Sequence, residues 1–234
     1  MSGLILVFDL DQTLIDSTAL FPKLAEEDKK PEADRDYFSI IDSTSNKTIL
    51  NDVLLPAVKL KGAGVDGIFL LTNNNSIQYV SRIIIYLNML AQNYVFNFSM
   101  LRKHVSRPSV LNPPKRLEDV QYMMANSSVP VPFTDTGNLA KRTFMFDDNS
   151  SHVIKDELLR EGVEDHYIEV QGPDLTPDGT NMGYISGKPD LTDYRPILLE
   201  LAKLQPTVGG SRTRHRNRYH KRTYKRRRIS KRKN

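Results

Sequence analysis

The sequence contains no cysteine. This absence excludes disulfide bonds, cysteine-based zinc sites and thiol nucleophiles. No feature of the sequence points to secretion. A membrane-spanning run is missing at the N-terminus as well. The apolar stretch at residues 4–10 is too short, is followed by acidic residues, and lacks the basic segment and cleavage signal of a leader peptide. We therefore expect a soluble, intracellular protein without a membrane partner.

Acidic residues are absent from the last stretch of the chain, residues 211–234, which holds 13 lysines and arginines. The whole chain carries a net charge of +5 from 33 basic and 28 acidic residues. Without the 13 basic residues of this stretch, residues 1–210 hold 20 basic and 28 acidic residues and are acidic overall. This asymmetry predicts a folded acidic domain, residues 1–204, followed by a basic, disordered tail, residues 205–234.

Short apolar runs alternate along the chain with segments of helical spacing. We predict strands at residues 4–8, 68–71, 94–101, 142–146 and 167–170, and helices at 51–61, 76–92, 115–125, 150–160 and 194–204. Residues 106–114, 126–139 and 171–189 are predicted to be loops, because they are rich in proline, glycine or polar residues. The alternation indicates an α/β fold with a doubly wound, Rossmann-like parallel sheet of about five strands.

Residues 17–48 have few periodic signals and many charges. A connection of this length beside an active site is often a flap or a small cap. We predict a short flap that holds a short helix or a hairpin. A solvated excursion without a role at the site is the alternative.

Two carboxylates follow the first predicted strand, in the segment Asp9-Leu10-Asp11. Packing does not explain them, because an unpaired buried carboxylate is costly and two close together repel unless a cation lies between them. Ligands of open α/β sheets bind at the carboxyl ends of the strands, where these residues fall. The segment therefore indicates a metal site. Alternatively, Asp11 caps the next turn and Asp9 lies in a surface loop.

Two more predicted strands end in polar residues. Thr72-Asn73 follows the second strand, and Asp147-Asp148 follows the fourth. Between them in sequence, Lys115 opens a predicted helix, where its charge opposes the helix dipole. A residue that breaks a local rule in this way indicates a functional placement.

These motifs, in this order, resemble the haloacid dehalogenase (HAD) superfamily over about residues 4–170. The resemblance rests on Asp-Leu-Asp-Gln-Thr at residues 9–13, the strand that ends at Thr72, Lys115, and Phe-Asp-Asp at residues 146–148. The second Asp of the first motif favours phosphatase chemistry over that of the family's dehalogenases.

The resemblance implies a role for each residue. Asp9 matches the nucleophile that forms an aspartyl-phosphate, and Asp11 the general acid and base. Thr72, with Asn73 beside it, and Lys115 match the groups that bind and neutralise the phosphoryl group. Asp9, Asp147, Asp148 and the backbone carbonyl of Asp11 match the ligands of Mg²⁺. Between the last two carboxylates, we favour Asp147 as the direct ligand.

Other residues offer weaker alternatives. Lys188 also resembles the family's lysine motif but comes after the Asp pair, and Lys103 and Lys141 are more distant candidates. His152 is predicted to be a surface residue at a helix start. The room between the motifs is too small for a large cap. The resemblance therefore implies a capless or small-cap phosphatase with an open site, of the kind that acts on macromolecular phosphomonoesters.

The basic tail suggests partners of its own. Its charge suits nucleic-acid backbones, Tyr219 and Tyr224 offer rings for stacking on bases, and a nuclear-import signal read by an import receptor is an equal contender. A solubilising tail is the plain alternative. Such a tail is compatible with a nuclear or virus-associated protein. The competing function is a nucleic-acid-binding protein on a HAD-like scaffold with little hydrolysis, and a third possibility is a phosphatase that the tail delivers to nucleic acid.

Overall fold

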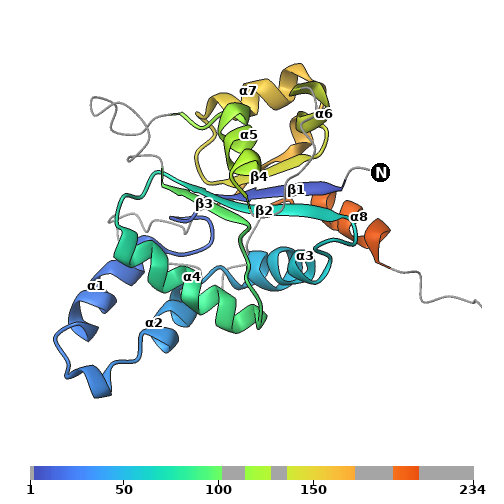
Figure 1. Cartoon of the computed structure of the whole chain (residues 1–234). Helices are drawn as coiled ribbons and strands as arrows, with labels where there is room; N and C mark the ends of the chain where they lie inside the picture. The colour runs from blue at the N-terminus through green and yellow to red at the C-terminus, as the bar shows by residue number, and fades with distance from the viewer. Residues whose placement is uncertain (1–2, 102–113, 128–135, 172–191, 206–234) are drawn as a thin grey trace, which may run out of the picture.

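The computed structural model describes residues 3–101, 114–127, 136–171 and 192–205 (Figure 1). Its centre is a five-stranded sheet in the order β3-β2-β1-β4-β5, in which every paired strand is parallel. The strands are β1 (Leu4–Phe8), β2 (Val65–Thr72), β3 (Phe98–Leu101), β4 (Thr143–Asp147) and β5 (Tyr167–Glu169). The predicted α/β fold with a doubly wound parallel sheet is confirmed.

Helices cover both faces of the sheet (Figure 1). On one face lie α5 (Leu117–Ala125), α6 (Thr136–Ala140) and α7 (Val153–Arg160). On the other lie α1 (Ser17–Glu27), α2 (Tyr37–Thr44), α3 (Leu55–Lys59), α4 (Ile77–Ala91) and α8 (Arg195–Leu204). Among the described residues, no helix is long and apolar enough to cross a membrane.

The strands are buried on both faces, which is why they read as continuous apolar runs. In β1, Leu6 and Phe8 pack into one hydrophobic cluster, and Ile5 and Val7 pack into the cluster on the opposite face. Phe8 stacks on Phe146 of the neighbouring strand at 4.5 Å between ring centroids. The two clusters anchor β1 as the central strand.

The chain changes direction across the sheet at β1. From β1 it runs outward to β2 and β3, and it then returns to β4 on the other side of β1 and continues to β5. The switch point of a doubly wound sheet leaves a crevice at the carboxyl ends of its central strands. Residues that follow β1, β2 and β4 therefore meet at one edge.

Several element boundaries differ from the prediction. The third strand starts at Phe98 rather than at residue 94, and the helix predicted at 51–61 is a π-helical segment, Ile49–Leu54, that continues into α3. The end of the loop predicted at 126–139 forms α6, while residues 128–135 lie outside the described part of the chain. Almost all of the loops predicted at 106–114 and 171–189 lies outside it too.

The segment after the first motif is a pair of helices, α1 and α2, joined through a 3₁₀ turn at Glu32–Asp34. Each helix begins after an aspartate. The side chain of Asp16 accepts a hydrogen bond from the Ala19 N–H at 3.1 Å, and that of Asp36 accepts one from the Ser39 N–H at 3.0 Å. Such caps satisfy amides that a helix start leaves without partners.

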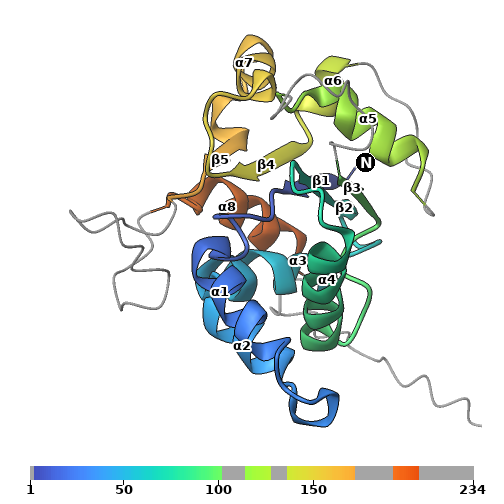
Figure 2. The same cartoon turned by 90° about the vertical axis from the view of Figure 1, so that its left-hand side faces the viewer.

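Backbone hydrogen bonds join the segment just before this helical pair to the segment at its end. The Asp16 N–H donates to the Thr44 carbonyl at 2.8 Å, and the Asn46 N–H donates to the Leu14 carbonyl at 2.9 Å. The pair lies beside α4 in both views (Figure 2). Arg82 of α4 bonds Asp28 at 3.0 Å and lies 4.2 Å from the centre of the Tyr37 ring.

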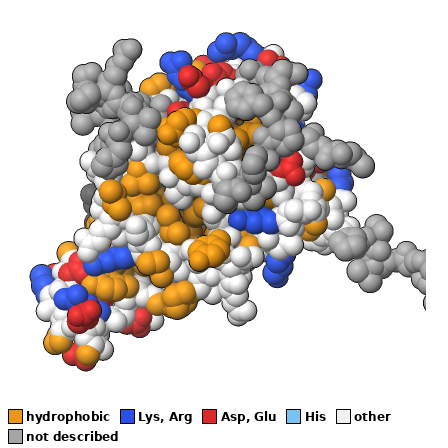
Figure 3. Space-filling view, viewed as in Figure 1, with side chains coloured by type: hydrophobic (Ala, Val, Ile, Leu, Met, Phe, Trp, Pro, Cys, Tyr) orange, Lys and Arg blue, Asp and Glu red, His pale blue; other side chains and the backbone are white. Residues whose placement is uncertain are grey.

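Helix α4 also keeps apolar side chains at the surface. Ile77, Ile85 and Met89 are each more than half exposed, and Tyr94 follows just beyond the helix. Hydrophobic side chains gather on the face of the molecule that Figure 3 shows. The helix is thus more apolar than its packing on the sheet requires.

Candidate active site

A cavity of about 530 Å³ opens at the carboxyl ends of β1, β2 and β4. The residues predicted from the sequence line it: Asp9, Asp11, Thr72, Asn73, Lys115, Asp147 and Asp148. They come from segments far apart in the chain, and the parallel sheet brings them together. The alternative in which Asp9 lies in a surface loop is wrong, because the residue is only 8% exposed.

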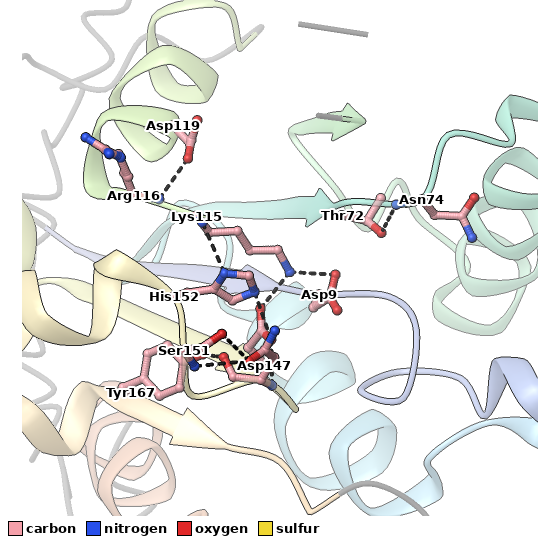
Figure 4. A network of polar contacts seen from close by, with 11 residues as sticks. Asp9, Thr72, Asn74, Lys115, Arg116, Asp119, Asp147, Ser151, His152 and Tyr167 are labelled. Atoms are coloured by element: carbon pink, nitrogen blue, oxygen red, sulfur yellow. Dashed lines mark hydrogen bonds and ion pairs between the residues drawn. The ribbon is translucent and has the colours of Figure 1, made fainter. Parts of the chain in front are cut away.

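Lys115 lies between two of the carboxylates (Figure 4). Its Nζ is 2.7 Å from Asp9 Oδ1 and 2.6 Å from Asp147 Oδ2. The lysine side chain is 1% exposed and that of Asp147 is fully buried. Burial favours the neutral amine, but the two carboxylates outweigh it and raise the pKa of Lys115. The ammonium therefore supplies the countercharge that two neighbouring buried carboxylates need.

The backbone of Lys115 is held from α7. Its N–H donates to His152 Nδ1 at 3.2 Å, and its carbonyl accepts from the Ile154 N–H at 2.9 Å. We predicted that Lys115 opens a helix. It does not, because α5 begins at Leu117 after an extended Arg116. Asp119 accepts from the Arg116 N–H at 2.8 Å and fixes the start of α5. The helix-dipole argument was thus wrong, although it led to the lysine that lies at the site.

Asp9, Asp147 and Asp148 could hold a metal ion, because each offers a carboxylate oxygen within 4.8 Å of the other two. Asp147 Oδ1 also accepts from the Asn149 N–H at 2.9 Å, so its carboxylate is fixed on both sides. Asp148 is partly exposed. Burial and the charges of Asp9 and Asp147 raise its pKa to about 7. Three carboxylates around one point are a donor set that suits a hard divalent cation.

Burial also raises the pKa of Asp9, with Asp147 adding to the effect and Lys115 opposing it. A cation among the three carboxylates would favour their charged forms. The group therefore has more negative charge than Lys115 alone compensates.

Asp11 faces a different set of partners. Its Oδ1 accepts from the Tyr79 hydroxyl at 3.1 Å, and its Oδ2 accepts from Asn74 Nδ2 at 2.9 Å. Burial raises the pKa of Asp11, while these two hydrogen bonds oppose the increase. The backbone after it turns sharply, with Gln12 at a φ of 61°. Asp11 is therefore a positioned carboxyl group, and its side chain is not one of the three around the possible metal position.

The segment after β2 supplies neutral polar groups. Thr72 is 1% exposed, and its hydroxyl oxygen accepts from the Asn74 N–H at 3.1 Å. This contact leaves the hydroxyl proton available to donate into the cavity. Asn73 Oδ1 is a buried acceptor without a hydrogen-bond partner. Both residues thus offer contacts that a ligand's polar atoms can complete.

Sequence reasoning missed His152, which is 5% exposed and lines the cavity instead of lying on the surface. Its Nε2 is 3.6 Å from Asp147 Oδ1, and its Nδ1 accepts from the Lys115 N–H. Because Nδ1 accepts a hydrogen bond, a neutral His152 carries its proton on Nε2, toward Asp147. Its position just before α7, five residues after Asp147, was the available signal.

The structure also separates the lysine candidates. Lys115 lies in the site, whereas Lys141 is exposed just before β4, at the opposite end of that strand from Asp147. Lys103 and Lys188 lie outside the described residues. His166, on the 3₁₀ turn before β5, stacks on Phe144 at 4.0 Å and does not line the cavity.

Comparisons with protein-family models, with curated protein sequences and with solved structures found no match to this chain.

Proposed function

We propose that this chain is a Mg²⁺-dependent phosphatase of the HAD superfamily, which hydrolyses a phosphomonoester through an aspartyl-phosphate on Asp9. The observation that carries the proposal is the pairing of one buried ammonium, that of Lys115, with Asp9 and Asp147 beside Asp148. A purely structural role is a poor explanation for three carboxylates and one lysine that line an open cavity.

Asp9 begins the reaction. Its carboxylate attacks the phosphorus atom, and the bond from phosphorus to the leaving oxygen breaks. Asp11 gives its proton to that oxygen, which a raised pKa favours because it keeps more of Asp11 in the acid form. The Thr72 hydroxyl and the Asn73 amide donate to the phosphoryl oxygens, and Lys115 balances their charge.

Asp11 then acts as the base. Its carboxylate takes a proton from a water molecule that attacks the phosphorus of the aspartyl-phosphate, so that inorganic phosphate and free Asp9 are released. Asp11 ends the cycle with its proton restored. Proton transfer of this kind contributes roughly 10²–10⁴-fold to a rate.

Asp9, Asp147 and Asp148 would hold the Mg²⁺ ion. Bound there, it would shield the anionic nucleophile from the anionic phosphate and orient the phosphoryl group for in-line attack. That the backbone carbonyl of Asp11 is a further ligand remains a prediction.

The test is hydrolysis of an aryl phosphate, such as p-nitrophenyl phosphate, with and without Mg²⁺. We expect Asp9→Asn to abolish turnover and Asp11→Asn to reduce it by roughly 10²–10⁴-fold. Asp16→Asn is the matched control, because Asp16 is a buried carboxylate of the same turn that caps α1 and does not line the cavity. If Asp9→Asn turns over substrate at the rate of the unmodified protein, the proposal is wrong.

A further inference from the structure

The lining of the cavity includes one apolar side chain among the described residues, Phe21 of α1. Its ring stacks on Tyr79 of α4 at 4.5 Å, with 22° between the planes. The residue is nevertheless 47% exposed. A large exposed ring held rigidly against a second ring at the rim of a polar cavity is a preformed stacking surface.

This ring is linked to Asp11 through Tyr79. Tyr79, on which Phe21 stacks, donates its hydroxyl proton to Asp11. If Asp11 protonates the leaving oxygen, the rest of the leaving group extends past Asp11 toward the Phe21 and Tyr79 pair. This step rests on the proposed function.

The charge of the cavity limits what the leaving group can be. Four carboxylates line it, and Lys115, already paired with two of them, is the one lysine or arginine in the lining that the structure describes. No described arginine or lysine is therefore placed at this cavity to pair with a second phosphate. The part of the leaving group that lies within the cavity is therefore uncharged.

The remaining lining is rich in amides. Gln12, Asn73, Asn75 and Asn149 line the cavity together with Phe21. Amide side chains both donate and accept hydrogen bonds. A flat ring with polar atoms along its edge matches an aromatic surface with amides nearby, whereas a phenyl ring has no such edge. A volume of about 530 Å³ also falls in the range of small-ligand sites.

We infer that the substrate is a nucleoside monophosphate, either free or as the phosphorylated terminal nucleotide of a strand, whose base stacks on Phe21. The phosphate lies against Lys115 and Thr72. The sugar passes Asp11, and the base reaches the exposed ring on α1. The helical insertion, which is the pair α1 and α2, thus provides the contact with the base. The residues at the carboxyl ends of the strands carry out the hydrolysis.

The test compares a nucleoside 5′-monophosphate with ribose 5-phosphate, which is the same ester without the base. The unmodified protein should prefer the nucleotide in kcat/KM. Since stacking of a base on an aromatic side chain is worth roughly 1–3 kcal/mol, Phe21→Leu should reduce this preference about 5- to 150-fold. The loss in kcat/KM should be larger for the nucleotide than for ribose 5-phosphate, and Phe21→Trp should retain the preference.

Phe38→Leu is the matched control. Phe38 is the other exposed aromatic residue of the described helical insertion, 40% exposed, and it packs on Tyr86 away from the cavity. This change should alter neither substrate's rate. Equal kcat/KM for the two substrates in the unmodified protein, or an equal loss on both in Phe21→Leu, would overturn the inference.

Binding separates this inference from the proposed function. Equilibrium binding of the nucleotide and of ribose 5-phosphate to Asp9→Asn needs no turnover. If no phosphate ester is hydrolysed, yet the nucleotide binds more tightly and needs Phe21, the proposed function fails and the nucleoside site stands. If both esters are hydrolysed with dependence on Asp9 but without a preference for the nucleotide, only the nucleoside site fails.

The source of the nucleotide is distinguished with oligonucleotides phosphorylated at the 5′ or the 3′ end. If strand ends are the source, an oligonucleotide should exceed the mononucleotide in kcat/KM. It should lose the advantage at high salt and when residues 211–234, with their 13 basic residues, are deleted. If free nucleotides are the source, the mononucleotide should match or exceed the oligonucleotide, and the deletion should have no effect on it.

Discussion

Replacing Lys115 by methionine tests the charge balance of the site. The change keeps most of the apolar stem and removes the ammonium that lies between Asp9 and Asp147. Two buried carboxylates, with oxygens within 4.8 Å, are then left facing each other and Asp148 without a countercharge. We expect the metal-free variant to be much less stable than the unmodified protein.

The geometry sets the size of the effect. At 2.7 and 2.6 Å, and at an effective dielectric constant of about 20, each ion pair has an attraction of roughly 6 kcal/mol. The cost of burying the ammonium offsets much of this attraction. Removing one partner of a buried pair reduces the free energy of unfolding by roughly 3–5 kcal/mol. For a domain of this size, that is a fall in Tm of about 6–20 °C.

The assay is urea and thermal unfolding, first with a chelator and then with Mg²⁺. Without the ammonium, the three carboxylates should bind a divalent cation more tightly, so Mg²⁺ should raise the Tm of Lys115→Met by more than that of the unmodified protein. Lys203→Met is the control, because Lys203 is 66% exposed and pairs with Glu200 at the surface of α8. Lys203→Met should lower the free energy of unfolding by at most about 1 kcal/mol.

Unfolding of metal-free Lys115→Met at the same urea concentration as the unmodified protein would show that the ammonium does not stabilise the two carboxylates. Equal stabilisation of both proteins by Mg²⁺ would refute the assignment of the metal position beside Lys115.

Two further predictions concern the same site. His152→Leu should weaken Mg²⁺ binding or activity by roughly 10–100-fold. His152→Asn should retain most of both, because an amide can accept from the Lys115 N–H and donate toward Asp147. If His152 were needed only for packing, both variants would lower the Tm and leave the Mg²⁺ affinity unchanged. Asp148 has a pKa of about 7, above its ordinary value, so the folded state keeps a proton that the unfolded state has lost between about pH 4 and 7. The metal-free protein should therefore lose stability as pH rises through this range, Mg²⁺ affinity should rise over the same range, and Asp148→Asn should flatten both profiles in unfolding and titration measurements.

Local patterns were sufficient to predict the sheet. β1 is an unbroken apolar run because both of its faces are buried, and the polar residues after β1, β2 and β4 mark the carboxyl edge. The parallel topology then brings Asp9, Thr72 and Asp147 together without any need to predict the loops. This is why the order of elements and half of the residues that line the cavity could be predicted from the sequence.

Contacts between distant segments explain what was missed. His152 reaches the site only because the fold places it against Lys115, 37 residues earlier in the chain. The helices of the insertion are fixed by tertiary contacts, such as that of Arg82 with Asp28, that the local pattern does not contain. Phe21 was missed for the same reason, because its place at the cavity depends on stacking against the ring of Tyr79 in α4.

The covalent intermediate is the central claim, and trapping it is the most direct test. The protein is mixed with Mg²⁺ and an excess of an aryl phosphate, quenched during turnover and treated with borohydride, which reduces an aspartyl-phosphate to homoserine. Peptide mass spectrometry then locates the change. We predict homoserine at position 9, dependent on substrate and absent from Asp9→Asn. Turnover without a modified Asp9, or with the modification at another aspartate, would contradict the account.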